Sequence, residues 1–377
     1  MTRLVAALVA LLILPVNLPA QATVPQADVI YVWESGGLAA GTLGRIAEVA
    51  DRHGASVSVE HRGTIQLLSV TRGDELVQSA PEGFVIPMAA LAIDRAASRS
   101  VVGSTVSEAL DRGEVVMGWS SASLRGAVVG DVVTFTGWDG STQKLPIGAI
   151  VPDVRVRSAE LIFSIETAER FGFSRLSSVT LWGFADGAAL YRDLEITFAG
   201  EFVGLDPDQS RNPDDVLSDV AAKRQFGEFA YRATGPGDKI QIDPVWVAAN
   251  IITVNLPILG TFKCHRSMLP YLEHALDEAI DAGLGSVIDP VDFQLAGGCY
   301  NARLIRGGDK GGAISRHSWG IAVDFNPSTN RYGGAVVMDP RLAEIFHKWG
   351  FAWGGGWVYP DGGHFEWTRL PASIVDT

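Results

Sequence analysis

Cysteine, histidine and long apolar stretches are scarce in this sequence of 377 residues, and their scarcity excludes several classes of protein. Two cysteines cannot build a disulfide-rich scaffold, and they do not form a CxxC pair that would hold a metal through thiolates. The sequence has no HExxH, no GxSxG and no phosphate loop that ends in GK[ST]. The signatures of thermolysin-type proteases, serine hydrolases and P-loop nucleotide-binding proteins are therefore missing.

The one long apolar run lies near the N-terminus, at residues 4–14, and follows a basic residue. Small residues at Ala20 and Ala22 come after it, which is the layout of a secretory signal peptide spanning residues 1–22. The run is shorter than the roughly 20 residues of a spanning helix, and Pro15 interrupts it. We therefore expect a secreted protein of the periplasm or cell wall, with no stable membrane span after signal cleavage.

Basic charge is also in short supply, with 30 Lys and Arg residues against 43 Asp and Glu residues. Proteins that bind nucleic acid carry basic surfaces that neutralise phosphates, so this balance argues against a nucleic-acid partner. In an oxidising compartment we expect the two cysteines, Cys264 and Cys299, to form a disulfide rather than a reactive site. Closing a loop of this length would stabilise the fold by about 3 to 4 kcal/mol in the chain-entropy model.

The residue pattern predicts two domains, both of the α+β class. Residues 23–203 alternate short β-branched runs with Gly and Asp, which indicates a separate strand-rich domain. Residues 204–239 begin with the Pro- and Asp-rich "GLDPDQSRNPDD" and are expected to be a linker. Residues 240–377 hold two amphipathic helices, expected at 267–283 and 339–350, and short strand-like runs such as "GIAVDF" and "HFEWT". This second domain should therefore contain a small antiparallel sheet.

Part of the first domain resembles a known type of extracellular module. The stretch from "SSASLRGAVVGDVVTF" to "SAELIFSIETAERFGF" is similar to extracytoplasmic domains of transporter-associated permeases. No activity is assigned from this similarity. We expect this domain to position or regulate the rest of the protein, by binding the cell wall or a partner protein.

Of the seven histidines, only His317 and His364 lie in matched surroundings, "SRHSWGIAVDF" and "DGGHFEW". A catalytic zinc takes three ligands of nitrogen, oxygen or sulfur type and leaves one position for water, whose pKa falls to about 7. With Asp324, the two histidines would supply two imidazoles and one carboxylate. Asp361, three residues before His364, is placed to accept a proton from that water. Glu366 is the alternative proton carrier, or it supports an imidazole N–H.

The two segments together resemble the zinc peptidases of the M15 family, which comprise D-Ala-D-Ala carboxypeptidases and L-alanyl-D-glutamate endopeptidases. The family motif is S-x-H-x-x-G-x-A-x-D, followed by an acidic residue three positions before a second His. The matching residues are Ser315, His317, Gly320, Ala322, Asp324, Asp361 and His364. The resemblance covers roughly residues 225 to 370. It implies a hedgehog/DD-peptidase-like fold, Zn²⁺ bound by His317, Asp324 and His364, and Asp361 as the general base.

By this resemblance the protein is a secreted metallopeptidase that hydrolyses peptide bonds in peptidoglycan peptides. A basic residue upstream of the first His would hold the substrate, and Arg303 is chosen over Arg306, although the family's Gly-Tyr-Arg-Ser type sequence is absent. The bond that is cut stays open between D-Ala-D-Ala, L-Ala-D-Glu and a cross-link. The alternative is a catalytically silent zinc-binding module that binds the cell wall or a partner protein. The presence of Asp361 argues against that alternative.

Overall fold

The computed structural model describes residues 29–369, apart from 138–139, 173–175, 207–215, 236, 297 and 306–311. The expected signal peptide and Arg306 therefore lie outside the described residues. Within those ranges, every helix falls short of the length and hydropathy that crossing a membrane requires.

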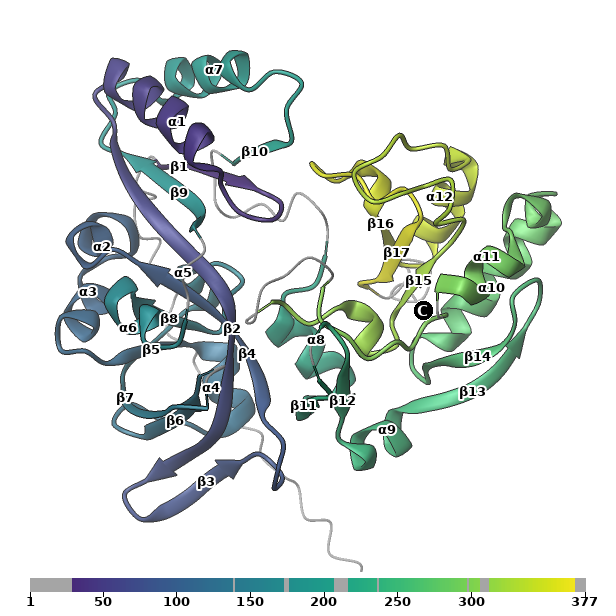
Figure 1. The fold of residues 1–377 in the computed structure, drawn as a ribbon, viewed down its shortest axis with the longest axis horizontal. Helices are drawn as coiled ribbons and strands as arrows, with labels where there is room; N and C mark the ends of the chain where they lie inside the picture. Colours follow the sequence, from purple (N-terminus) through teal and green to yellow (C-terminus); the bar gives the residue numbers. More distant parts are fainter. Residues whose placement is uncertain are drawn as a thin grey trace, which may run out of the picture.

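A large mixed sheet dominates the first half of the described chain (Figure 1). In the residues that the structure describes it has ten strands, in the order β10-β1-β9-β2-β4-β8-β5-β7-β6, with β3 attached to β2. Because β2 also pairs with β6, the strands from β2 to β6 along this order close into a ring. The strands are β1 (Val29–Glu34), β2 (Ser56–Arg72), β3 (Glu75–Ser79), β4 (Ile86–Ile93), β5 (Val115–Gly118), β6 (Val132–Thr136), β7 (Thr142–Val151), β8 (Leu161–Ser164), β9 (Leu176–Trp182) and β10 (Val203–Asp206).

Alternating apolar residues explain how this ring is filled. Ile65 and Leu67 on β2, Met88 on β4 and Phe163 on β8 are buried in one apolar cluster, together with Phe135 on β6. A second apolar cluster lies where α1 and α7 cover β1 and β9. The helices of this half are α1 (Ala40–Arg52), α2 (Arg95–Val102), α3 (Ser104–Asp111), α4 (Trp119–Arg125), α5 (Asp153–Val156), α6 (Ile165–Glu169) and α7 (Gly187–Thr197).

The stretch expected to be a linker, residues 204–239, carries regular structure in its described part. Helix α8 (Asp219–Phe226) begins at Ser218, whose hydroxyl accepts a hydrogen bond from the amide of Ala221 at 3.3 Å. Strand β11 (Tyr231–Ala233) follows and pairs with β12 (Ile240–Ile242). Phe226 and Tyr231 are buried in the same apolar cluster as the C-terminal elements, so this stretch folds against the second half of the chain.

The C-terminal half contains short sheets and helices around one apolar cluster that reaches from Ala222 to Trp367. Strands β13 and β14 form a hairpin, and β15, β17 and β16 form a small antiparallel sheet in that order. The remaining elements are α9 (Pro244–Asn250), β13 (Ile251–Leu256), β14 (Gly260–His265), α10 (Leu269–Asp281), η1 (Gly285–Val287), α11 (Pro290–Ala296), η2 (Arg316–Ser318), β15 (Ala322–Asp324), α12 (Pro340–Lys348), β16 (Phe351–Trp353), η3 (Gly354–Gly356) and β17 (His364–Trp367).

Both helices expected in this half are confirmed as α10 and α12. Asp339 caps α12 as its position before Pro340 indicates, because its carboxylate accepts from the amide of Arg341 at 2.9 Å. Helix α10 spans Leu269–Asp281 within the expected range 267–283, and Met268 is the residue that precedes it. The mixed α+β architecture and the small antiparallel sheet also agree with the sequence pattern.

Candidate metal centre

Three side chains that the sequence singles out come together in the C-terminal half. His317, Asp324 and His364 offer ligand atoms that all lie within 4.8 Å of one another. Among the described residues, these three form the one group of three or more histidine, cysteine or acidic side chains whose ligand atoms are close enough to hold a metal ion. The histidines are buried and Asp324 is partly exposed, so the group lies at the edge of the core.

The small sheet explains why two of these residues meet although 40 positions separate them. Strand β15 pairs antiparallel with β17, and the register places Asp324 directly opposite His364. Directly opposed residues in such a pair have their side chains on the same face. His317 reaches the same place from η2 through a tight turn at Gly320, which has φ +72°. A Cβ at Gly320 would lie 2.9 Å from the backbone nitrogen of His265, so a larger residue does not fit.

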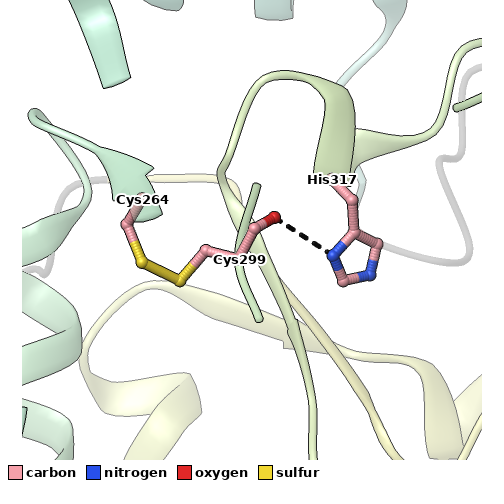
Figure 2. Close-up of a disulfide and its surroundings, with 3 residues drawn as sticks. All are labelled: Cys264, Cys299 and His317. Carbon is pink, nitrogen blue, oxygen red and sulfur yellow. Dashed lines mark hydrogen bonds between the residues drawn. A yellow bond between two sulfur atoms is a disulfide. The ribbon is translucent and has the colours of Figure 1, made fainter. Parts of the chain in front are cut away.

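The ring of His317 is oriented for binding a cation. Its Nδ1 lies 3.2 Å from the carbonyl oxygen of Cys299, which can only accept, so Nδ1 carries the proton and donates (Figure 2). In the neutral ring, which is the form that binds a metal, the other nitrogen, Nε2, then presents a lone pair. That atom is buried without a hydrogen-bond partner and lies 3.2 Å from Asp324 Oδ2. A buried acceptor with no donor is costly, and a metal ion at this position would satisfy it.

Cys299 is itself held in place by a disulfide to Cys264, as expected from the sequence. Figure 2 shows the covalent link on one side of Cys299 and its carbonyl aimed at His317 on the other. The amide of Asn301 also donates to the carbonyl of His317 at 3.0 Å. The chain segment behind His317 is thus fixed by a covalent bond and by hydrogen bonds.

His364 faces two carboxylates. Its Nδ1 lies 2.8 Å from Asp324 Oδ1, and its Nε2 lies 3.4 Å from Glu366 Oε2. Burial alone would lower the pKa of His364, but the hydrogen bonds and charges of Asp324 and Glu366 outweigh it and raise that pKa to about 10. Burial would raise the pKa of Asp324, yet His317 and His364 hold it well below its usual range. Without a metal, the cluster therefore keeps a proton on His364.

The donor set fits zinc, and its spacing is slightly tighter than a bound ion requires. Tetrahedral zinc with bonds of 2.0 to 2.2 Å places its ligand atoms about 3.3 to 3.6 Å apart. His317 Nε2 and Asp324 Oδ2 are separated by 3.2 Å, and His364 Nδ1 is 2.8 Å from the second oxygen of Asp324. Two imidazoles and one carboxylate are a ligand set that zinc accepts while leaving a position for water. A shared carboxylate between two histidines also explains the depressed pKa of Asp324 without further partners.

Asp361 lies beside this group. Burial raises its pKa, Asp324 adds to the effect, and His364, His317 and Arg303 oppose it. These mutual charge effects place Asp361 within electrostatic reach of all three potential ligands. The turn that carries it is tight, because the carbonyl of Asp361 accepts from the amide of His364 at 3.0 Å. Asp361 is not one of the three potential ligands.

The other expected site residues take different places. Arg303 contributes positive charge at Asp361, and its amide donates to Ser318 Oγ at 2.9 Å. Glu366 is 4% exposed and lies on the Nε2 side of His364, away from the Nδ1 that faces Asp324. Arg306 lies outside the described residues.

Two groups beside the candidate metal site could not be predicted from the sequence. Arg316 reaches Glu366 with its Nε, 3.9 Å from Oε1, although nothing in the motif marks the position next to His317. The carbonyl of Cys299 holds His317, and a backbone atom leaves no signal in residue type. The ring centroid of Trp357 lies 5.4 Å from that of His364.

Residues 308–367 match an M15 peptidase family described as D-alanyl-D-alanine carboxypeptidase. The matched stretch contains all of His317, Asp324, Asp361 and His364, and it supports an M15 peptidase domain in this part of the chain. No curated protein sequence matches the chain. Among solved structures, the extracellular domain of the noncanonic ABC-type transporter YknZ from Gram-positive bacteria is similar at 10% identity and a TM-score of 0.29, covering 48% of this chain and 100% of that chain. A likeness at this TM-score carries no argument about fold or function.

Proposed function

We propose that the C-terminal half is a zinc-dependent peptidase that hydrolyses peptide bonds in peptidoglycan stem peptides. The observation that carries the proposal is the buried Nε2 of His317, which has no hydrogen-bond partner and faces Asp324 beside His364. The M15 family match over residues 308–367 supports the same chemistry. His317, Asp324 and His364 would hold the zinc, in a domain of the hedgehog/DD-peptidase type.

When bound, zinc would polarise the scissile carbonyl and lower the pKa of the attacking water. Asp361 accepts the proton of that water and then donates it to the leaving amine. Its raised pKa suits the task, since a base that must also act as an acid works best when its pKa lies nearer to the operating pH. Arg303 contributes positive charge that stabilises the oxygen of the tetrahedral intermediate.

Glu366 fits the supporting role better than the role of base. It lies against Nε2 of His364, whereas Nδ1 is the atom that faces Asp324 and would hold the metal. A carboxylate on the outer nitrogen of a ligating histidine fixes the ring and increases its basicity. Asp361 is therefore the proposed base and Glu366 the group that orients His364.

Mass spectrometry of purified peptidoglycan fragments tests the proposal, after incubation with the mature protein with and without a zinc chelator. We expect loss of a terminal alanine or of a longer peptide, and that product names the bond. Activity should stop with the chelator and return with added zinc. Tight zinc binding without any product would support the silent binding module instead. Secretion, the two-domain division and a wall or protein partner for the N-terminal half remain predictions.

A further inference from the structure

Helix α8 lies at the junction of the two halves of the molecule, between the large sheet and the C-terminal elements (Figure 1). It belongs to the stretch expected to be a linker. It makes polar contacts with both halves: one set of contacts is with the N-terminal half, and the other is with the C-terminal half.

Toward the N-terminal half, α8 enters a buried cluster of charges. Lys223 Nζ lies 2.6 Å from Glu160 Oε1 and also donates to the carbonyl of Pro87. Arg125 completes the cluster, 3.1 Å from Glu160 and 2.5 Å from Glu228. The side chains of Lys223, Glu160 and Arg125 are no more than 1% exposed, and the two positive charges balance the two negative ones. Buried charges need their partners at fixed positions, so this cluster sets how α8 docks on the sheet.

Toward the C-terminal half, the start of α8 holds an arginine of the metal centre. Asp219 Oδ1 accepts from Arg316 Nη1 at 2.8 Å, and the carbonyl of Leu217 accepts from Nη2. Arg316 Nε then lies 3.9 Å from Glu366, which lies 3.4 Å from His364 Nε2. The contacts thus run without interruption from α8 to the outer nitrogen of a potential metal ligand.

The end of α8 and the residues just after it pack against both segments that carry the histidines. The rings of Phe226 and Trp367 are 5.6 Å apart, and Trp367 follows Glu366 on β17. The rings of Phe229 and Trp319 are 4.6 Å apart, and Trp319 Nε1 donates to the carbonyl of Gly227 at 3.2 Å. Trp319 directly follows η2, which contains His317. A shift of α8 would therefore disturb both histidine segments.

We propose that α8 positions the metal centre: the N-terminal half fixes α8 through Glu160, and α8 fixes Arg316 and Glu366, which orient His364. The N-terminal half is then an intramolecular partner of the peptidase site. Asp219 and Arg316 are positioning residues, since they reach the metal only through Glu366 and His364. The inference rests on the proposed function in one respect, that the His317, Asp324 and His364 group binds zinc.

The dissociation constant of zinc, measured on the full chain by competition with a chromophoric chelator, tests this inference without any hydrolysis. Loss of an outer-sphere partner of a zinc-bound histidine typically costs 10- to 100-fold in metal affinity. Asp219 acts two contacts beyond Glu366, through Arg316, and Glu160 acts further away, through Lys223 and α8. We therefore expect a loss of roughly tenfold at most for Asp219→Asn and a smaller, several-fold loss for Glu160→Gln.

Glu60→Gln is the matched control. Glu60 on β2 is 0% exposed, as Glu160 is, and it pairs with the buried Arg157 in the N-terminal half. Its other contacts, Ser178 and Thr180, also lie in the N-terminal half. Breaking either pair leaves a buried charge without its partner, so both variants lose stability. Only Glu160→Gln should weaken zinc binding.

Circular dichroism identifies a temperature at which the variants are folded, and zinc affinity is measured there. If Glu160→Gln does not fold, Asp219→Asn alone provides the test. Unchanged zinc affinity in the folded Asp219→Asn protein would overturn the proposal, as would an equal loss in Glu60→Gln. Failure of the unmodified protein to bind zinc would overturn the proposed function and this inference together. If zinc affinity falls in the variants as expected but the unmodified protein hydrolyses no peptide, only the proposed peptidase activity would be overturned.

Discussion

The molecule buries charge in two regions, and the atoms left without partners differ between them. Near the large sheet, the buried nitrogens without a hydrogen-bond partner include Arg125 Nε and Arg157 Nη2, which carry protons and repel cations. In the C-terminal half Nε of Arg303 and Nε1 of Trp246 are buried nitrogens that also carry protons, but Nε2 of His317 differs, because in the neutral ring it has a lone pair while Nδ1 donates to a carbonyl. Buried charge alone therefore does not mark a metal site. His317 Nε2 marks one because its lone pair lies beside two further potential ligands, Asp324 and His364.

The charge balance separates the two regions further. Arg125 and Lys223 balance Glu160 and Glu228, so that cluster is complete as it stands. In the other cluster the raised pKa of His364 keeps a proton next to Asp324, a position that a cation can take over. The first cluster fixes geometry, and the second has the composition of a binding site.

The largest expected effect comes from removing a ligand. We expect Asp324→Asn to weaken zinc binding by more than about 100-fold, the upper range for outer-sphere changes, because it removes a coordinating oxygen and its charge. Equilibrium dialysis with metal analysis measures the loss. His274→Ala, at an exposed histidine stacked on Trp349, is the control and should bind zinc normally. Equal losses in both variants would contradict the assignment.

Next in size is the effect on turnover of Asp361→Asn. General acid–base catalysis contributes about 10²- to 10⁴-fold, so we expect a fall of this size in kcat. Zinc affinity should stay unchanged, because Asp361 lies outside the ligand group. Steady-state kinetics at saturating zinc measure the change. Full activity in this variant would remove Asp361 from the mechanism and leave Glu366 as the base.

A smaller loss is expected for Glu366→Gln. Removing the carboxylate on His364 Nε2 should weaken zinc binding by about 10- to 100-fold. With zinc supplied in excess, most of the activity should return. A variant that binds zinc normally and is inactive would instead show that Glu366 carries the proton.

The disulfide should matter more to stability than to the site. Replacing both Cys264 and Cys299 with Ser removes a crosslink over a separation of 35 residues, which costs about 3 to 4 kcal/mol in the chain-entropy model. Thermal unfolding measures this loss. Zinc affinity should fall only a few-fold by comparison with ligand loss, because hydrogen bonds such as Asn301 to His317 still hold the segment. Complete loss of zinc binding in a folded double variant would contradict this account.

The last expected effect does not involve the metal: it is a dependence of stability on pH at His265, next to the end of α8. Burial lowers its pKa to about 4, and the ring donates to the carbonyl of Phe226 through Nε2 and accepts from the amide of Ser267 through Nδ1. In the unfolded chain His265 binds a proton as the pH falls through about 6.5, whereas in the folded chain it does so only near pH 4. His265 therefore contributes a loss of stability as the pH falls from 6.5 to 4. Thermal unfolding of His265→Gln across this range should show a weaker dependence, and an unchanged slope would contradict the prediction.

The sequence predicts the candidate site better than it predicts the surroundings of the site. His317, Asp324, Asp361 and His364 stand out because their spacing and residue types are constrained by the chemistry, and the structure brings them together. Helix α8 is difficult to predict from the sequence, because the stretch that contains it, residues 204–239, begins with several Pro and Asp residues. The helix is stabilised by tertiary contacts such as Lys223 with Glu160, which a local pattern does not reveal.

The closed ring of strands in the N-terminal half also could not be predicted from the sequence. Short β-branched runs indicate strands, but they do not give the pairing of β2 with both β4 and β6. That pairing depends on how the whole strand bends around the apolar cluster, which includes Phe135 and Phe163. Local pattern thus gives the class of the fold, and long-range packing gives its topology.

X-ray absorption spectroscopy at the zinc edge, combined with metal analysis, tests the central claim most directly. We expect one zinc per chain, bound by two imidazole nitrogens and by oxygen at about 2.0 to 2.2 Å, with no sulfur ligand. We also expect Asp324→Asn to lose this zinc. A protein that takes up no zinc, or an Asp324→Asn variant that keeps the same metal with the same ligands, would contradict the central claim.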